Sequence, residues 1–164
     1  MNNPWTSLNL DHPPYILAGD KVNIAIIQDR WTKSKSQNKE DLTLHLELFP
    51  EPFIGGVDAP IVLLNLNPGF DVQSDLDWHR KSIMREAVAD NLSRRAQEYP
   101  FYPLRPDFVG SAIAKWWRTL LAPWIADHPD NLKQVARSVL AVELFPYHSK
   151  KYGRYRARDA IVCL

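Results

Sequence analysis

The chain has little that would assign it to a secreted, membrane-bound or strongly charged class of protein. Its one cysteine, Cys163, excludes an internal disulfide and a cysteine-rich zinc site, and fits a reducing, cytoplasmic compartment. No apolar run approaches the ~20 residues of a membrane helix, and the first residues do not read as a signal peptide. The formal net charge is only +1, so a site for nucleic acid has to be a local patch.

Glycine is also scarce. Six glycines stand against thirteen prolines, which predicts rigid connections punctuated by proline. A length of 164 residues, with 45% hydrophobic and 24% charged residues, is typical of one globular domain. We therefore expect a single domain over residues 1–164. The apolar segment at 160–164 leaves open whether the chain is the N-terminal part of a longer protein, and an oligomer is also open.

Three segments have strand patterns. Residues 61–66 form a continuous apolar run that ends at Asn67-Pro68-Gly69, which predicts a strand covered on both faces. Residues 139–145 predict a second buried strand. Residues 43–48 alternate between apolar and polar side chains and predict a half-exposed strand. Residues 49–56 are rich in proline and glycine and predict a loop.

The helical patterns lie between these strands. Residues 20–31 favour a helix, with a strand over 22–27 as the alternative, and further helices are expected over 77–95, 111–124 and 131–137. The pattern over 111–124 is the clearest, and we expect its apolar stripe to be core: Ile113, Trp116, Trp117, Leu120, Leu121 and Trp124. Strands that alternate with helices predict an α/β fold, namely a three-layer αβα sandwich with a mostly parallel central sheet. If the chain is truncated, this sandwich is incomplete.

Polar residues follow both buried strands. Asn65, Asn67 and Gly69 lie at the end of the first strand, and His148 and Ser149 follow the second. Ligands of open α/β sheets bind beyond the carboxyl ends of the strands, and the ends of two parallel strands open on the same edge. The alternative interpretation is an ordinary turn whose Asn side chains bond their own backbone, next to a hydrogen-bonded histidine with no role in proton transfer.

The segment Ile61-Val-Leu-Leu-Asn-Leu-Asn-Pro-Gly-Phe70 resembles the first motif of the uracil-DNA glycosylase superfamily. The most similar branch is the mismatch-specific one, whose strand ends in Gly-X-Asn-Pro-Gly. The resemblance implies that Asn67 positions the hydrolytic water and that Phe70 stacks on a base. Asn65 stands where the family usually has glycine, and the family's second motif, a His/Asn-Pro-Ser turn, is absent.

Two further features bear on chemistry. A basic patch interleaved with tyrosines suits phosphates and unstacked bases, and consists of Lys150, Lys151, Arg154 and Arg156; its alternative interpretation is a solvated helix start. Glu143 lies inside an apolar strand, so if buried it must be protonated or paired, and Arg118 or Arg137 could be its partner.

These features predict a uracil-DNA glycosylase-like domain that binds or excises a nucleobase; as an enzyme it would be an N-glycosylase-type hydrolase. The expected catalytic residues are Asn67 and His148, and the expected substrate-binding residues are Asn65, Gly69, Phe70 and Ser149. The alternatives are a non-catalytic module for nucleotide or nucleic acid and an interaction protein with a degenerate site. We expect no cofactor, no membrane partner and, because the histidines lack ligand spacing, no metal.

Overall fold

The computed structural model describes residues 3–34, 39–72, 74–125 and 131–153. Its strands are β1 (Phe53–Gly55), β2 (Ile61–Asn65) and β3 (Val139–Glu143). Its α-helices are α1 (Lys21–Thr32), α2 (Asp75–His79), α3 (Ser82–Leu92), α4 (Ala112–Leu120), α5 (Ala122–Ile125) and α6 (Asn131–Ser138). Short 3-10 helices connect them: η1 (Pro4–Ser7), η2 (Ala18–Asp20), η3 (Lys39–Leu42), η4 (Tyr102–Leu104) and η5 (Pro106–Phe108). The protein is therefore α/β.

The described strands form one mixed sheet in the order β1-β3-β2. β2 pairs with β3 in parallel, with Leu63 opposite Ala141, whereas β1 pairs with β3 antiparallel. The expectation of a mostly parallel sheet is thus not met among these strands, because the segment predicted to be a loop supplies the antiparallel one. The parallel pair, however, contains the two strands that the sequence indicates most clearly.

Gly55 explains how that loop segment becomes a strand. Its φ is +116°, and a Cβ there would lie 2.3 Å from the Val139 carbonyl oxygen. Only glycine avoids both problems. On the other side of β1, the buried Asn91 of α3 accepts from the Gly55 N–H at 3.1 Å and donates to the Phe53 carbonyl at 2.6 Å. One glycine and one buried amide therefore fix this short strand between β3 and α3.

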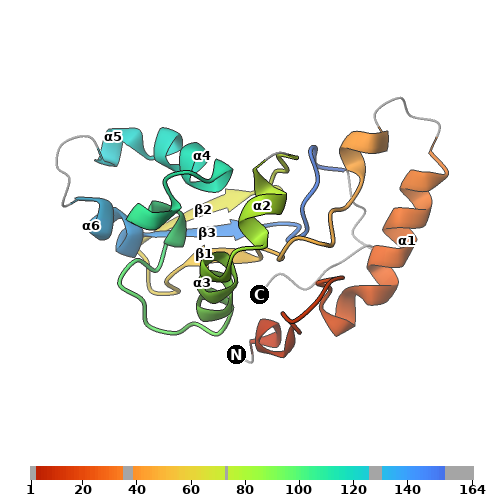
Figure 1. Cartoon of the computed structure of the whole chain (residues 1–164), viewed down its shortest axis with the longest axis horizontal. Helices are drawn as coiled ribbons and strands as arrows, with labels where there is room; N and C mark the ends of the chain where they lie inside the picture. Colours follow the sequence, from red (N-terminus) through yellow and green to blue (C-terminus); the bar gives the residue numbers. More distant parts are fainter. Residues whose placement is uncertain (1–2, 35–38, 73, 126–130, 154–164) are drawn as a thin grey trace.

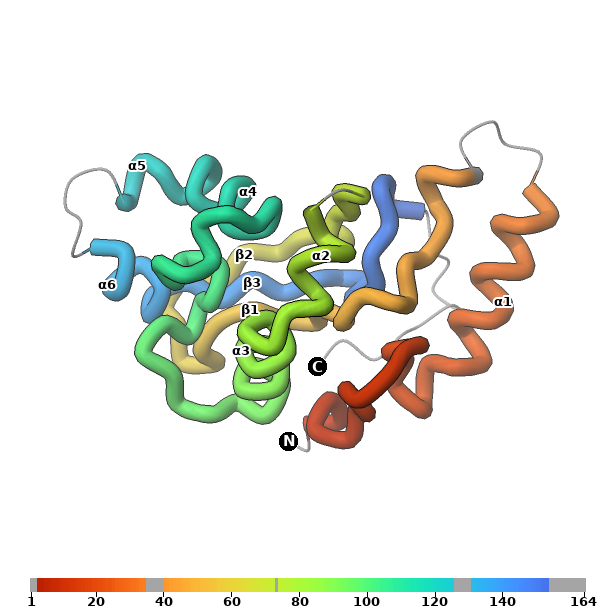
Figure 2. The backbone as a smooth tube through the Cα atoms, viewed as in Figure 1, coloured from red at the N-terminus to blue at the C-terminus, as the bar shows by residue number. Residues whose placement is uncertain are grey.

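The helices are distributed unevenly around the sheet (Figure 1). In this view α2 and α3 lie in front of the strands, α4 and α5 lie above them, and α1 lies at the far end of the molecule from α5 and α6. The tube in Figure 2 shows that the orange segment before β1 runs beside the dark blue turn after β3. A hydrogen bond of 2.9 Å from the His45 N–H to the His148 carbonyl joins the two.

Several local predictions are confirmed and others are wrong. The helix alternative over 20–31 is confirmed by α1, and α6 and β3 lie where helix and strand are expected. Residues 43–48 are not a strand, because isolated backbone bonds, such as His45 to His148, replace a ladder there. The helix expected over 77–95 is two helices, α2 and α3, which are separated at Arg80 and Lys81.

Two burial predictions are wrong in a related way. Among the described strands β2 lies at the edge of the sheet, and its outward side chains are exposed, with Leu64 at 81%. The apolar stripe over 111–124 divides in burial within α4 itself, and α4 ends at Leu120 before α5 begins at Ala122. Trp117 is 3% exposed, whereas Trp116 is 54% and Trp124 is 48% exposed. Apolar side chains on β2, α4 and α5 therefore form an exposed surface instead of core.

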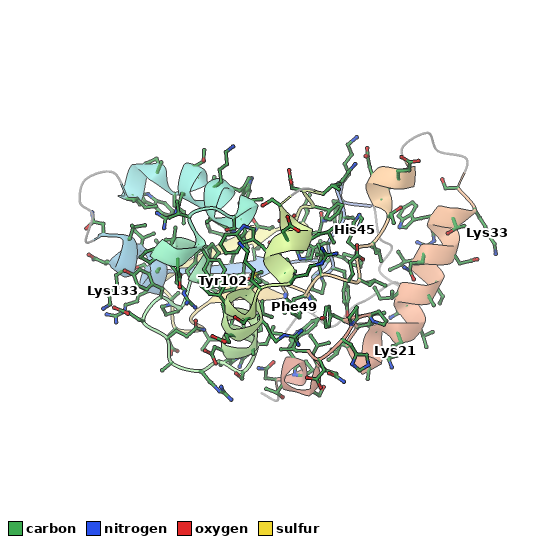
Figure 3. All side chains as sticks on the ribbon, in the orientation of Figure 1. Lys21, Lys33, His45, Phe49, Tyr102 and Lys133 are labelled. Atoms are coloured by element: carbon green, nitrogen blue, oxygen red, sulfur yellow. The ribbon has the colours of Figure 1, made fainter. Side chains whose placement is uncertain are left out.

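The core lies between the sheet and the helices in front of it and extends to η1 and α1, where Trp5, Ile24 and Ile27 are buried. Its largest buried side chains include Trp5, Phe49, Tyr102 and Tyr147. Figure 3 shows Phe49 and Tyr102 in the interior, while Lys21, Lys33 and Lys133 lie at the periphery. Within the residues described, no helix is both long enough and apolar enough to cross a membrane.

Candidate functional site

The ends of β2 and β3 lie side by side. Backbone bonds continue the parallel ladder beyond the strands, from the Leu144 N–H to the Asn65 carbonyl at 3.0 Å and from the Phe145 N–H to the Leu66 carbonyl at 2.9 Å. The turns then meet through Asn67, whose Nδ2 donates to the carbonyl of Ser149 at 3.1 Å and to its Oγ at 3.0 Å. The expectation that both polar strand ends open on one edge is confirmed.

Asn67 acts first as a connection between these turns. Besides its two bonds to Ser149, its Nδ2 donates to the Pro68 carbonyl at 2.9 Å. The amide hydrogens are therefore already engaged, which leaves Oδ1 as the group that can bind a ligand or water. This geometry combines both interpretations of the turn, since the side chain bonds its own backbone and also reaches the neighbouring strand end.

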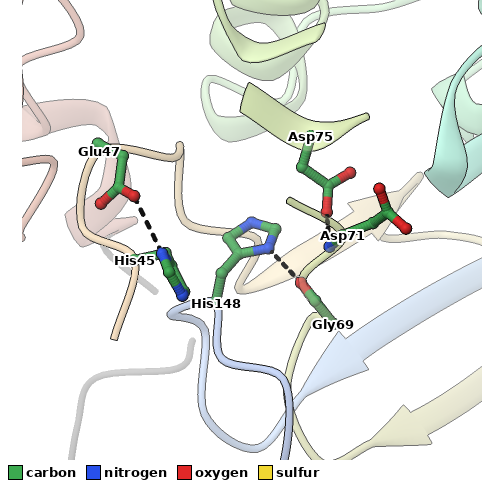
Figure 4. A network of polar contacts seen from close by, with 6 residues as sticks. All are labelled: His45, Glu47, Gly69, Asp71, Asp75 and His148. Carbon is green, nitrogen blue, oxygen red and sulfur yellow. Dashed lines mark hydrogen bonds and ion pairs between the residues drawn. The ribbon is translucent and has the colours of Figure 1, made fainter. Parts of the chain in front are cut away.

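His148 is buried between two loops, with 4% of its surface exposed. Its Nδ1 lies 2.7 Å from the Gly69 carbonyl oxygen, and its Nε2 lies 3.0 Å from the Phe49 carbonyl oxygen. Figure 4 shows the ring between the Gly69 turn and the loop that carries His45. Burial lowers the pKa of His148, while the Gly69 carbonyl and the Asp75 carboxylate oppose that shift.

A cavity of about 650 Å³ opens at these strand ends. One wall, which we call the polar wall, contains Asn65, Asn67, Gly69, Glu143 and His148. A second group of lining residues, which we call the aromatic wall, contains Trp78, Ile113, Trp116 and Trp117. Phe70 also lines the cavity, whereas Ser149 does not and instead holds Asn67 in place. A concave site with an apolar wall and a few converging polar groups is the usual form of a small-molecule site.

Glu143 lies between the core and this cavity and is 4% exposed. Its Oε1 accepts from Asn65 Nδ2 at 2.9 Å, and among the described residues its Oε2 has no hydrogen-bond partner. Burial raises the pKa of Glu143 to about 7. Of the two alternatives for a buried Glu143, the raised pKa favours the protonated state, and Arg118, one of the two candidate partners, instead donates to the carbonyls of Leu104 and Arg105.

Phe70 and Asp71 complete the turn after β2. The Phe70 ring stacks on His45 with their centroids 3.4 Å apart, so one of its faces is already covered. Asp71 is exposed, and its N–H donates to Asp75 Oδ2 at 2.6 Å (Figure 4). Burial also raises the pKa of Asp75, which lines the cavity. Phe70 can therefore offer only its second face to a ligand.

The structure adds three buried residues that sequence reasoning did not select as a group. Glu51, His79 and His148 place ligand-capable atoms within 4.8 Å of one another, and all three line the cavity. Their positions in the sequence follow no motif. The one sequence feature that could have pointed to this group is the charged Glu51 between two prolines. The set resembles a metal site, but His79 Nδ1 accepts from the Phe49 N–H at 2.9 Å, so its Nε2 carries the proton instead of a free lone pair.

The basic patch is only partly described. Lys150 is exposed, and Lys151 forms an ion pair of 2.7 Å with Asp41. Arg154 and Arg156 lie outside the described residues. Within the described part, therefore, Lys150 is the member of the patch that forms no ion pair.

Comparison with known proteins finds no matching family model, no matching curated protein and no matching solved structure. Function is therefore inferred from the geometry of the site and from the resemblance of residues 61–70.

Proposed function

We propose that this chain is a uracil-DNA glycosylase-like domain that binds a nucleobase in the cavity and hydrolyses its N-glycosidic bond. The observation that carries the proposal is the convergence of the Asn67 and His148 turns on one cavity that also contains Glu143 and an aromatic wall. A planar base suits such a site, because aromatic side chains stack on either of its faces while polar groups bind its edge.

Glu143 is the group best suited to activate water. Its Oε2 is the one buried carboxylate oxygen in the described residues without a partner, and a pKa of about 7 leaves it partly ionised near neutral pH. A general base is most effective when its pKa lies near the working pH. In the proposed reaction the bond between C1′ and the base nitrogen breaks, water oxygen bonds to C1′, and the water proton passes to Glu143. The departing base takes a proton from solvent.

Asn67 and His148 have supporting roles in this proposal. Asn67 Oδ1 is the acceptor that remains for the water, in agreement with the role that the resemblance implies. His148 fixes the distance between the Gly69 turn and the Phe49 loop. The same resemblance implies a three-layer sandwich. Its central sheet would be mostly parallel and wider than the sheet that the described strands form. The proposed substrate is nucleic acid, with Lys150 near one of its phosphates. A cytoplasmic location is also part of the proposal.

The test is base release from DNA. Duplex and single-stranded oligonucleotides with uracil, hypoxanthine or mismatched thymine are incubated with the protein, and abasic sites are detected by alkaline cleavage. Glu143→Gln keeps the acceptor for Asn65 but removes the general base, so release of the nucleobase should fall by about 10²- to 10⁴-fold. Binding of the same oligonucleotides should change little, because the shape of the cavity is retained.

Glu98→Gln is the matched control. Glu98 is an exposed glutamate that pairs with Lys133 far from the cavity, so its variant should release bases at the wild-type rate. Equal rates for wild type and Glu143→Gln would contradict the role of Glu143. Absence of both binding and release in the wild type would contradict the proposed function itself.

A further inference from the structure

The outer edge of β2 is open in the part of the chain that the structure describes. The strand order β1-β3-β2 gives β2 a neighbouring strand on one side only. Among the described residues, the backbone groups of residues 61–64 bond to β3 and to no other segment. A strand at such an edge presents a row of unpaired N–H and C=O groups, to which a further strand can add.

β2 has none of the local features that protect an edge strand from pairing. Proteins usually interrupt such edges with a proline, a charged side chain or a bulge. Residues 61–65 contain neither proline nor charge, and they pair with β3 in continuous register from Ile61 to Asn65. The outward side chains Val62 and Leu64 are apolar and are 53% and 81% exposed. An unprotected apolar edge of this kind is typical of a strand that pairs with another chain.

An apolar stripe on α4 and α5 runs beside this edge. Trp116, Leu120 and Trp124 are 54%, 52% and 48% exposed. Trp116 lines the strand-end cavity together with Leu64, and Trp124 lines a smaller depression of about 220 Å³ together with Ile61. The stripe therefore follows β2 along its length, and Figure 1 shows α4 and α5 on the same side of the sheet as β2.

Together these residues form a surface that is large enough to hold two copies of the chain together. We call it the edge surface, and it consists of Val62, Leu64, Trp116, Leu120 and Trp124. From their exposed fractions, these side chains leave about 600 Å² uncovered, and each partner of a specific complex buries roughly 600–1,000 Å². None of the five is charged, so the surface is complementary to itself, as a two-fold interface requires. A formal net charge of +1 means that two copies repel each other little.

We propose that two copies of this chain associate through the edge surface, with β2 of one copy antiparallel to β2 of the other. A two-fold axis through Leu63, the middle residue of β2, lets residues 61–65 of both copies pair and places Leu64 opposite the partner's Val62. The described strands of the two copies then form one continuous sheet, and the α4–α5 stripes meet across the axis. This association does not depend on the proposed function.

The experiment measures the mass of the full chain by sedimentation equilibrium over a range of concentrations. The wild type should reach twice the mass of one chain. Leu64→Lys places two like charges beside the axis and should weaken association by about 100-fold or more. Circular dichroism should show that this variant folds, because Leu64 is exposed. Val22→Lys is the matched control, since Val22 is 71% exposed on α1 at the other end of the molecule, and it should associate like the wild type.

Cross-linking tests the geometry of the pair even if Leu64→Lys does not fold. In a Cys163→Ser background, Leu64→Cys introduces a single thiol that lies about 7–8 Å from its mate across the axis, so a short bismaleimide should join two chains. Val22→Cys in the same background should stay uncross-linked. A wild type that is monomeric at every concentration would overturn the inference and would mean that something other than a second copy covers β2. Equal association by wild type and a folded Leu64→Lys, or equal cross-linking at the two positions, would also overturn it.

Discussion

The two walls of the cavity are held in different ways. On the polar wall, Asn67 alone makes three hydrogen bonds, and His148 contacts two backbone carbonyls. On the aromatic wall, adjacent tryptophans of α4 have opposite surroundings: Trp117 is buried against Phe101, while Trp116 is more than half exposed. The polar wall is therefore fixed by the protein itself, whereas on the aromatic wall Trp116 leaves more than half of its surface uncovered. A substitution in one wall is expected to leave the other wall unchanged.

The largest expected effect is on the buried half of the aromatic wall. Trp117→Ala removes a buried ring whose edge packs on Phe101, with centroids 4.7 Å apart, and should lower the free energy of unfolding by about 3–5 kcal/mol. Trp116→Ala, one residue earlier, should lower it by less than about 1 kcal/mol. Urea unfolding followed by circular dichroism measures both. Similar losses for the two variants would show that the difference in burial is not real.

The second prediction concerns the acids behind the polar wall. Burial raises the pKa of Glu51 from 4.5 to about 8, so the folded state binds a proton that the unfolded state has released over that range. The stabilisation of the folded state by this bound proton is fully present below pH 4.5 and is lost as pH rises toward 8. The free energy of unfolding should thus fall by up to about 1.4 kcal/mol per pH unit within that window.

Glu51→Gln isolates this contribution, because glutamine keeps an acceptor for Tyr102 but does not titrate. Unfolding measured in steps from pH 5 to pH 9 should show a shallower slope for this variant than for the wild type. Glu47→Gln, at an exposed position, should keep the wild-type slope. Parallel slopes for all three proteins would contradict the burial of a proton at Glu51.

A smaller loss is expected at the connection between the strand ends. Asn67→Ala removes the three hydrogen bonds of Nδ2 and leaves Ser149 without them, which should cost about 1–3 kcal/mol of unfolding free energy. Asn67→Asp keeps the size but lacks the donor, so it should lose a similar amount. A variant as stable as the wild type would mean that the turns meet without this side chain.

The smallest effect on folding is expected at the exposed half of the aromatic wall. Trp116→Ala should leave folding nearly unchanged but weaken binding of a base by about 1–3 kcal/mol, because stacking on an aromatic ring contributes that much. Trp124→Ala removes an equally exposed tryptophan that does not line the cavity, so binding should be unaffected. Equal binding by wild type and Trp116→Ala would remove the aromatic wall from the site.

Sequence patterns determined the parts of this protein that depend on neighbours in the chain. The apolar runs at 61–66 and 139–145 indicated β2 and β3, and the polar residues after them indicated where the cavity lies. These predictions succeed because strand formation and turn chemistry depend on local side chains. The alternating residues 43–48 show the limit of such patterns, since alternation gives a strand only where another strand is present to pair with it.

Tertiary structure decided the rest, because burial depends on which elements arrive from elsewhere in the chain. No sequence pattern distinguishes Trp117, which meets Phe101, from Trp116, which meets solvent. Glu51, His79 and His148 are far apart in the sequence, and only packing brings their polar atoms together. Their protonation states follow from that burial, since removing water disfavours charge whichever residues lie beside them in the chain.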